Sequence, residues 1–252
     1  MTLHGTLILA ALTRHGAYLA ADSRSTGPEL NSVQKVFQCG SNAFVGITGH
    51  LVARGQTIGA QGQVLCDASI NIMEILRHFS SEYSGDGTDL VDRVTRRIYD
   101  FLAGYWMLVI RPSRDSFLAS YPNVSEFCEI PILGRIGGAY NLVSIHFPLS
   151  ADGRLLKPSV QDRFEGADEN TEYIIAFGKP VDGEGIEADF RTSEGVLATM
   201  AALYRKAIAA HQDTVGEPID IGFLDENGAR WIATKLNLDQ FPASRHEGPE
   251  AV

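Results

Sequence analysis

The sequence has few cysteines, no excess of basic residues and no long apolar run, and each absence excludes a class of protein. Three cysteines in 252 residues, none in a CxxC pair, cannot build a disulfide framework, so a reducing, cytoplasmic setting is expected. The formal net charge of −10 argues against nucleic acid and against an anionic membrane surface as partners. No segment is long enough to cross a membrane, and no signal peptide is evident. A globular protein is expected.

Hydrophobic patterning divides the chain into blocks of strands and blocks of helices. Short apolar runs bounded by turn residues predict strands, and apolar spacings of three and four predict helices. Segregated blocks favour α+β layering in one domain over repeated βαβ units. The segment 148–172 is interpreted as an insertion or long loop. The expected strands are 6–12, 17–21, 35–39, 43–47, 130–135, 140–147, 173–177, 219–224 and 229–234, and the expected helices are 65–79, 88–105 and 193–211.

Several residues near the start of the chain could carry chemistry. Thr6 begins the first strand, Asp22 ends the second, and Lys35 opens the third. Gly46 and Gly49 bracket a strand end, where backbone N–H groups could receive an oxyanion. Each residue alone has an ordinary explanation, such as a turn-forming aspartate or a solvated edge lysine.

Together, these residues resemble a known pattern. Gly5 and Thr6, Asp22 within DSRST, Lys35 within QKV and a following glycine resemble the opening of β-type proteasome subunits and their bacterial homologues, over roughly the first 50 residues. Asp22 lies 16 positions after Thr6, as it does after the nucleophile in that family. Thr2, the rival nucleophile, lies 20 positions before Asp22 and fits poorly.

The resemblance implies a fold and a domain organisation. The expected fold class is α+β, a four-layer αββα sandwich of two antiparallel sheets between helix layers, as in N-terminal-nucleophile hydrolases. Residues 1–5 would be a short propeptide, 6–236 a single domain and 237–252 a flexible tail.

The resemblance also assigns catalytic roles. Thr6 would be the nucleophile, freed by cleavage after Gly5, with its own α-amine as the base. Lys35 would lower the pKa of that amine, and Asp22 would orient Lys35. The Gly46 N–H would stabilise the tetrahedral oxyanion.

Substrate contacts carry over to further positions. Thr26 and Thr48 or Gly49 would contact the substrate backbone. Phe44 matches the floor of the specificity pocket, where a bulky side chain would favour small apolar residues. An ordinary core position is the alternative interpretation of Phe44.

The sequence departs from the family pattern at a supporting Ser/Asp/Ser set. Gly178 and its neighbours stand where the first serine is expected, without any serine. Asp213 could fill the acidic position only with a one-residue gap, and Val215 replaces the second serine. These changes bear on activity more than on fold.

The expected function is a self-compartmentalised threonine peptidase of a divergent bacterial branch, without cofactor or metal. It would assemble into homo-oligomeric, stacked rings, cleave peptides or unfolded proteins, and receive substrate from a partner such as an ATPase. Two alternatives stay open: a catalytically inactive ring scaffold, and an N-terminal-nucleophile amidase acting on a small molecule.

Overall fold

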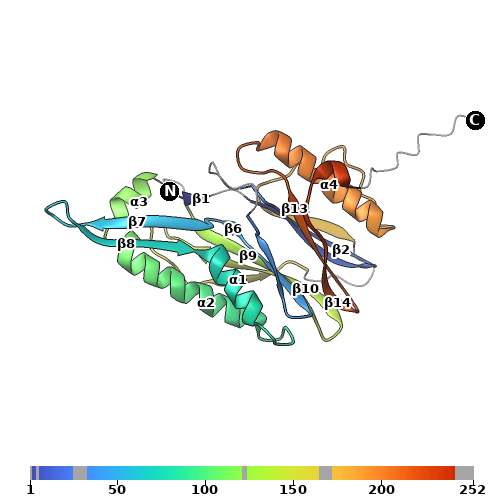
Figure 1. Cartoon of the computed structure of the whole chain (residues 1–252), viewed down its shortest axis with the longest axis horizontal. Coiled ribbons are helices and arrows are strands. Elements are labelled where there is room, and N and C mark those ends of the chain that lie inside the picture. Colours follow the sequence, from blue (N-terminus) through green and yellow to red (C-terminus); the bar gives the residue numbers. More distant parts are fainter. Residues whose placement is uncertain (1, 4–5, 25–32, 121–123, 165–171, 242–252) are drawn as a thin grey trace, which may run out of the picture.

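The computed structural model describes residues 2–3, 6–24, 33–120, 124–164 and 172–241 (Figure 1). Within these ranges the strands pair into three antiparallel sheets. The strands are β1 (Thr2–Leu3), β2 (Leu7–Thr13), β3 (Gly16–Asp22), β4 (Val36–Cys39), β5 (Ala43–Gly46), β6 (Thr48–Gly49), β7 (Val52–Ile58), β8 (Val64–Asn71), β9 (Glu126–Ile136), β10 (Ala139–Pro148), β11 (Ser159–Asp162), β12 (Tyr173–Gly178), β13 (Ile219–Asp225) and β14 (Gly228–Leu236). The helices are α1 (Ile72–Glu82), α2 (Leu90–Tyr105), the π-helical η1 (Trp106–Ile110), α3 (Arg114–Ser120), α4 (Ser193–Ala210) and the 3-10 helix η2 (Leu238–Gln240).

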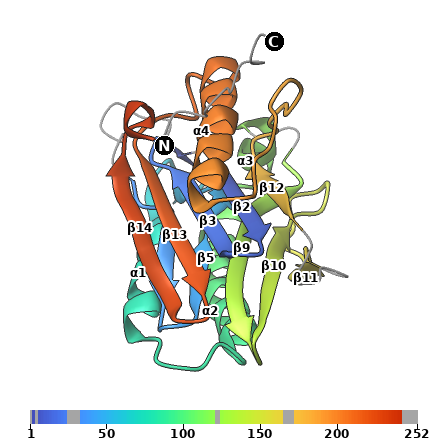
Figure 2. The same ribbon diagram turned by 90° about the vertical axis from the view of Figure 1, so that its right-hand side faces the viewer.

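The first sheet carries the N-terminal hairpin at its centre. Its strand order is β12-β2-β3-β13-β14. Every residue of β2 and β3 is buried, because α4 covers one face of this sheet and the second sheet covers the other (Figure 2). Because both faces of β2 and β3 are covered, their sequences show no alternation of polar and apolar residues.

The second sheet packs face to face with the first. Its path is β11-β10-β9-β5-β4, and β6 pairs with β9 beside β5. The long loop expected at 148–172 is therefore wrong in part, since Ser159–Asp162 extends the sheet by pairing with β10. An apolar layer that includes Ile8, Leu19, Phe44 and Leu133 fills the space between the two sheets.

The third sheet was not expected. β7 and β8 form a hairpin that projects from the body of the protein, here called the β7–β8 arm, and β1 pairs with its free edge (Figure 1). The predicted helix at 65–79 is wrong in its first half, because β8 continues to Asn71. There the Asn71 side chain accepts a hydrogen bond from the Glu74 N–H at 3.0 Å and begins α1.

Two further core clusters attach the helices to the sheets. The stripe of α4 that contains Val196, Met200 and Tyr204 packs on the outer face of the first sheet. Leu76 of α1 and Ile98 of α2 pack on the outer face of the second sheet. Leu238 and Phe241 are buried in the α4 cluster, so the described chain is packed as far as residue 241.

The predicted fold class, a four-layer αββα sandwich, is wrong. The described residues are mostly β structure in three antiparallel sheets, with few and short helices. The physical reason lies in residues 52–71, which pair with each other as the β7–β8 arm instead of adding to a helix layer. Of the helices in the described residues, α4 alone covers the first sheet, and α1 and α2 share the other side with the third sheet.

Candidate active site

The N-terminal hairpin brings Thr6 and Asp22 together. Thr6 directly precedes β2 and Asp22 ends β3, and the register of the two strands pairs Ile8 with Ala21. Leu7 therefore lies opposite Asp22, and its N–H donates to Asp22 Oδ1 at 2.8 Å. The backbone that follows the candidate nucleophile is thus held by the carboxylate that the sequence singled out.

Lys35 reaches the same carboxylate from the second sheet. Its Nζ lies 3.0 Å from Asp22 Oδ1, and neither side chain is exposed. The Lys35 ammonium also donates to the carbonyl of Arg24. The structure therefore joins Thr6, Asp22 and Lys35, which lie far apart in sequence, into one buried cluster.

The carboxylate of Asp22 is a centre of hydrogen bonds. Besides Lys35 and Leu7, the backbone N–H groups of Arg24 and Gly216 donate to Oδ2 at 3.1 and 3.3 Å. Burial raises the pKa of the Asp22 carboxyl, and Lys35 and the amide donors act against that rise. Four donors on one carboxylate favour its ionised form.

Burial also changes the proton affinity of Lys35. Removal from water lowers the pKa of its ammonium, and the Asp22 carboxylate opposes that shift. A lysine with a lowered pKa is better suited to proton transfer near neutral pH than an exposed one. The pair therefore offers both a positive charge and an exchangeable proton close to Thr6.

Gly178 closes the site on the side of β12. The Thr6 carbonyl accepts a hydrogen bond from the Lys179 N–H at 3.1 Å. A Cβ on Gly178 would lie 2.3 Å from the Thr6 carbonyl oxygen and 3.2 Å from Thr48 Cβ, and the φ of Gly178 is +81°. Only glycine fits this approach. Gly178 stands where the family pattern has a serine, and its close approach to Thr6 was not predicted from the sequence.

Thr48 and Gly49 lie on the same side as Thr6. Thr48 is buried and contacts Gly178, as described above. The His50 N–H donates to the Phe127 carbonyl, so the alternation of antiparallel bonds turns the Gly49 N–H away from β9. That amide is therefore not used by the sheet.

Gly46 and Phe44 face the interior between the sheets. The Ile47 N–H donates to the backbone carbonyl of Lys35, so the Gly46 N–H points toward β9 within the sheet. Phe44 is fully buried and packs edge-on against Trp231 at 5.2 Å between ring centroids. The roles predicted for these two residues stay predictions.

Of three other predicted residues, the structure describes only Asp213. Gly5 and Thr26 lie outside the described residues. Asp213 is exposed in the turn after α4, and the same turn instead presents the Gly216 N–H to Asp22 and the Gln212 carbonyl to Arg24. The contacts from this turn to the Asp22 and Arg24 side chains are thus made by backbone groups.

A second ion pair, between the exposed Lys235 and the buried Asp220, adjoins the first and was not predicted from the sequence. Lys235 Nζ donates to Asp220 Oδ2 and to Ser23 Oγ, both at 2.8 Å. The Lys235 charge lowers the pKa of Lys35, and the Asp220 charge raises it. Lys235 has a φ of +56°, and its N–H also donates to Asp220. This backbone distortion could not be read from the sequence.

A polar cluster lies between the sheets beside β6. His146 Nδ1 is 2.6 Å from Glu126 Oε1, and its Nε2 is 2.9 Å from Ser144 Oγ. Arg163 donates to Ser144 at 2.8 Å and to Glu129 at 3.0 Å. Because Glu129 pairs with Thr48 and Arg163 stacks on Phe177, this cluster forms a charged wall near the Thr6 site.

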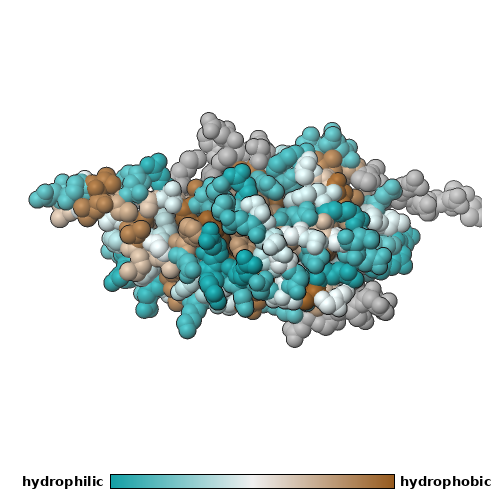
Figure 3. All heavy atoms as spheres, turned by 60° about the horizontal axis from the view of Figure 1, so that its bottom comes forward, coloured by the Kyte–Doolittle hydropathy of each residue, from teal (hydrophilic) through white to brown (hydrophobic). Residues whose placement is uncertain are grey.

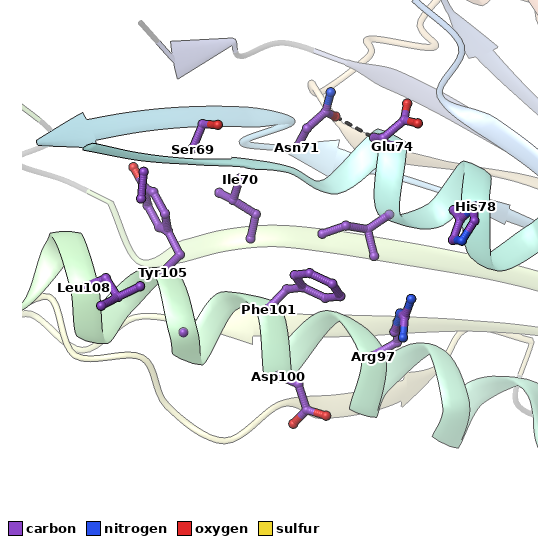
Figure 4. Close-up of a pocket in the computed structure, with 13 residues that line it drawn as sticks. Ser69, Ile70, Asn71, Glu74, His78, Arg97, Asp100, Phe101, Tyr105 and Leu108 are labelled. Carbon is purple, nitrogen blue, oxygen red and sulfur yellow. Dashed lines mark hydrogen bonds between the residues drawn. The ribbon is translucent and has the colours of Figure 1, made fainter. Parts of the chain in front are cut away.

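A groove lies elsewhere on the molecule. It measures about 560 Å³ and lies between β8, α1 and α2 (Figure 4). Ile70, Phe101 and Leu108 line it, and Glu74 and Arg97 lie along its rim. Its apolar lining suits a docking surface better than a hydrolytic site.

Comparison with known proteins does not identify the chain. No family model matches the sequence, and no curated protein matches it significantly. Among the described residues, no helix has the length and apolar character needed to span a membrane. In the same residues, no group of three or more His, Cys, Asp or Glu side chains is arranged to hold a metal ion.

Proposed function

We propose that this protein is an N-terminal-nucleophile threonine peptidase similar to proteasome β-type subunits, with Thr6 as the nucleophile. One observation carries the proposal: Thr6 directly precedes β2, beside a fully buried Asp22–Lys35 ion pair, and Asp22 also accepts a hydrogen bond from the Leu7 amide. A buried ion pair is costly to build and adds little stability, so its position next to a threonine favours a catalytic explanation.

The proposed reaction uses the α-amine of Thr6 as its base. The amine takes the proton from Thr6 Oγ as that oxygen adds to the substrate carbonyl, and returns it to the departing amine. Water then hydrolyses the acyl-ester and restores Thr6. The Lys35 charge keeps the amine in its neutral, basic form, and Asp22 orients Lys35.

The oxyanion of the intermediate needs a preorganised donor. The family resemblance assigned this role to the Gly46 N–H, which faces β9 within its sheet. The Gly49 N–H faces away from β9, next to Thr48 and Gly178. We therefore favour Gly49 as the donor, with Thr48 beside it as a substrate contact.

Self-cleavage would create the active form. Thr6 is only 1% exposed and has no free amine while residue 5 is attached. Its Oγ would attack the Gly5 carbonyl, the C–N bond would break to leave an ester, and water would release residues 1–5 as a carboxylate. Self-association into rings would confine this activity.

The exposed apolar residues support self-association. Ile58, Val64 and Leu65, near the end of the β7–β8 arm, are each more than half exposed. Brown spheres mark this end of the molecule in Figure 3. The groove between β8, α1 and α2 offers the same chain an apolar recess. A stacked, bacterial ring in the cytoplasm is consistent with three free cysteines, and an ATPase is the expected partner for feeding unfolded protein.

An inactive ring scaffold is the second candidate. It is favoured by the exposed position of Asp213 and by Val215 in place of the supporting serine. A small-molecule amidase would use the same threonine chemistry.

Intact mass of the purified protein, beside a Thr6→Ala variant, tests the proposal. Loss of residues 1–5 in the wild type alone, together with hydrolysis of peptides, supports a Thr6 peptidase. Loss of Met1 alone, with no hydrolysis of peptides or amides, supports the scaffold. Loss of residues 1–5 with hydrolysis of small amides but not of peptides supports the amidase.

A further inference from the structure

Thr2 and Leu3, which precede Thr6 in the chain, occupy the free edge of β7. β1 pairs antiparallel with β7, so that Thr2 lies opposite Ala53 and Leu3 opposite Val52. Thr2 and Leu3 are the fourth and third residues before the bond that Thr6 would cleave. We propose that this edge of β7 is the binding site for the backbone of extended peptide substrates, and that the leader is its first occupant.

The hydrogen-bond pattern of the arm makes Val52 the anchor. The Ile72 N–H donates to the Leu51 carbonyl at 2.9 Å, which places the hydrogen-bonded pairs of β7 and β8 at odd-numbered β7 residues such as Ala53. The N–H and C=O of Val52 therefore point away from β8, toward Leu3. A peptide backbone on this edge of β7 can therefore hydrogen-bond to both the N–H and the C=O of Val52.

The edge is within reach of the reaction centre. Thr48 contacts Gly178, which contacts Thr6, and Val52 follows Thr48 by four positions. Leu3 precedes Thr6 by only three positions, so the pair formed by Leu3 and Val52 lies a short length of chain from the site on both sides. A substrate whose scissile bond lies at Thr6 therefore brings its third preceding residue to Val52.

This mode of recognition specifies a substrate class. Strand addition to a sheet edge binds the peptide backbone, so affinity depends on extended conformation and length more than on side-chain identity. Folded proteins cannot present such a segment. The site thus selects unfolded chains and peptides with at least four residues before the scissile bond, and the uncleaved leader excludes them.

Peptide length gives the decisive test. This inference rests on the proposed peptidase function for its activity measurement. In the processed enzyme, Val52→Pro removes the N–H donor on the edge, and we expect about tenfold lower kcat/KM for a substrate with four residues before the scissile bond. A substrate with two residues there keeps its kcat/KM. Equal losses on both substrates, or no loss on either, would overturn the inference.

Gln56→Pro is the matched control on the same edge. The alternation that frees the Val52 N–H also turns the Gln56 N–H away from β8, but Gln56 lies beyond the described pairs with β1. This variant should keep kcat/KM on both substrates. Unfolding midpoints of the two proline variants are compared. If the midpoint of Val52→Pro alone falls, a substrate with proline as its third residue before the scissile bond, which leaves β7 intact, should show the same loss of kcat/KM, and an unchanged kcat/KM for that substrate would overturn the inference.

Amide hydrogen exchange separates this inference from the catalytic proposal. In full-length Thr6→Ala protein, which keeps its leader, the Val52 amide should exchange at least tenfold more slowly than in Thr6→Ala/Leu3→Pro protein. Slow exchange of the Val52 amide, without hydrolysis by the wild type, would contradict the proposed peptidase function and support peptide binding at the edge of β7. Hydrolysis by the wild type, with equal exchange of the Val52 amide in both variants, would contradict peptide binding at the edge of β7 and support the peptidase function.

Discussion

The ammonium of Lys35 lies 3.0 Å from the carboxylate of Asp22, and neither side chain touches solvent. Each charge is stable in this position only because the other is present. The pair also connects the two facing sheets, since Asp22 ends β3 and Lys35 precedes β4. Removing one partner should therefore affect both folding and hydrolysis.

Lys35→Met should abolish hydrolysis and destabilise the fold by about 3 kcal/mol, because it leaves a buried carboxylate without its counter-charge. Denaturant unfolding with a peptide assay measures both effects. Arg54→Met is the control, since Arg54 and Asp67 form an exposed pair. Similar unfolding midpoints for the two variants would contradict the importance of the buried pair.

The neighbouring pair should tune the pH dependence of activity. Activity should rise as the Thr6 amine, whose pKa the Lys35 charge holds below the ordinary value of about 8, loses its proton, and fall as Lys35 loses its own. Because the Lys235 charge lowers the pKa of Lys35, Lys235→Met should move the alkaline limb of kcat/KM to higher pH. Asp220→Asn should move it to lower pH, because the Asp220 charge raises that pKa. Shifts of both variants in one direction would contradict this coupling.

Gly178→Ala should disturb the site directly. The added Cβ would lie 2.3 Å from the Thr6 carbonyl, and the backbone has φ +81°. We expect a loss of about 1–3 kcal/mol in stability and no removal of residues 1–5. Gly185→Ala is matched for backbone strain, with φ +73° and no atom within 4 Å of its Cβ, and should keep self-cleavage. Intact mass of both variants distinguishes contact from strain.

The central part of the candidate site could be predicted from sequence because it lies on local hairpins. Thr6 and Asp22 belong to one hairpin, and their spacing fixes which residues face each other. Gly216, Asp220 and Lys235 could not be predicted in this way. They reach the site from the other end of the chain, through turn geometry and a positive φ that leave no pattern in the sequence.

The β7–β8 arm shows why the fold class was predicted wrongly. The apolar spacing of Ile72, Leu76 and Phe79 correctly indicates a helix. The predicted helix began at residue 65, however, and residues 65–71 belong to β8. Gly59 and Gly62 are residues that indicate a turn, and the Gly62 N–H donates a hydrogen bond to the Gly59 carbonyl in the turn between β7 and β8. Because residues 52–71 form a hairpin and not a helix, they do not contribute to a helix layer, and a third sheet is added to the fold.

The cysteines should differ sharply in reactivity. Burial raises the pKa of the Cys39 thiol to about 12 and that of Cys128 well above its ordinary value, so neither forms the thiolate that iodoacetamide needs. Cys66 is partly exposed on β8. Native protein at pH ~8 should therefore take one alkyl group, and unfolded protein three. Peptide mapping that places the native label on Cys39 would contradict the packing of the second sheet.

The arm should control self-association. Leu65 is 63% exposed near its end, and burying such a side chain in a neighbouring copy would favour assembly by the hydrophobic effect. Leu65→Asp should shift the protein from oligomer to monomer in light scattering after size exclusion, because a carboxylate is costly to bury in an apolar recess. Val160→Asp changes a residue of 51% exposure on β11, away from the arm, and should leave the oligomer intact.

A further variant, Phe101→Asp, tests the groove as the receiving surface. If the groove receives the arm, Phe101→Asp and Leu65→Asp each dissociate the oligomer, whereas dissociation by Leu65→Asp alone places the contact elsewhere. An oligomer that survives both substitutions would show that neither surface holds the copies together.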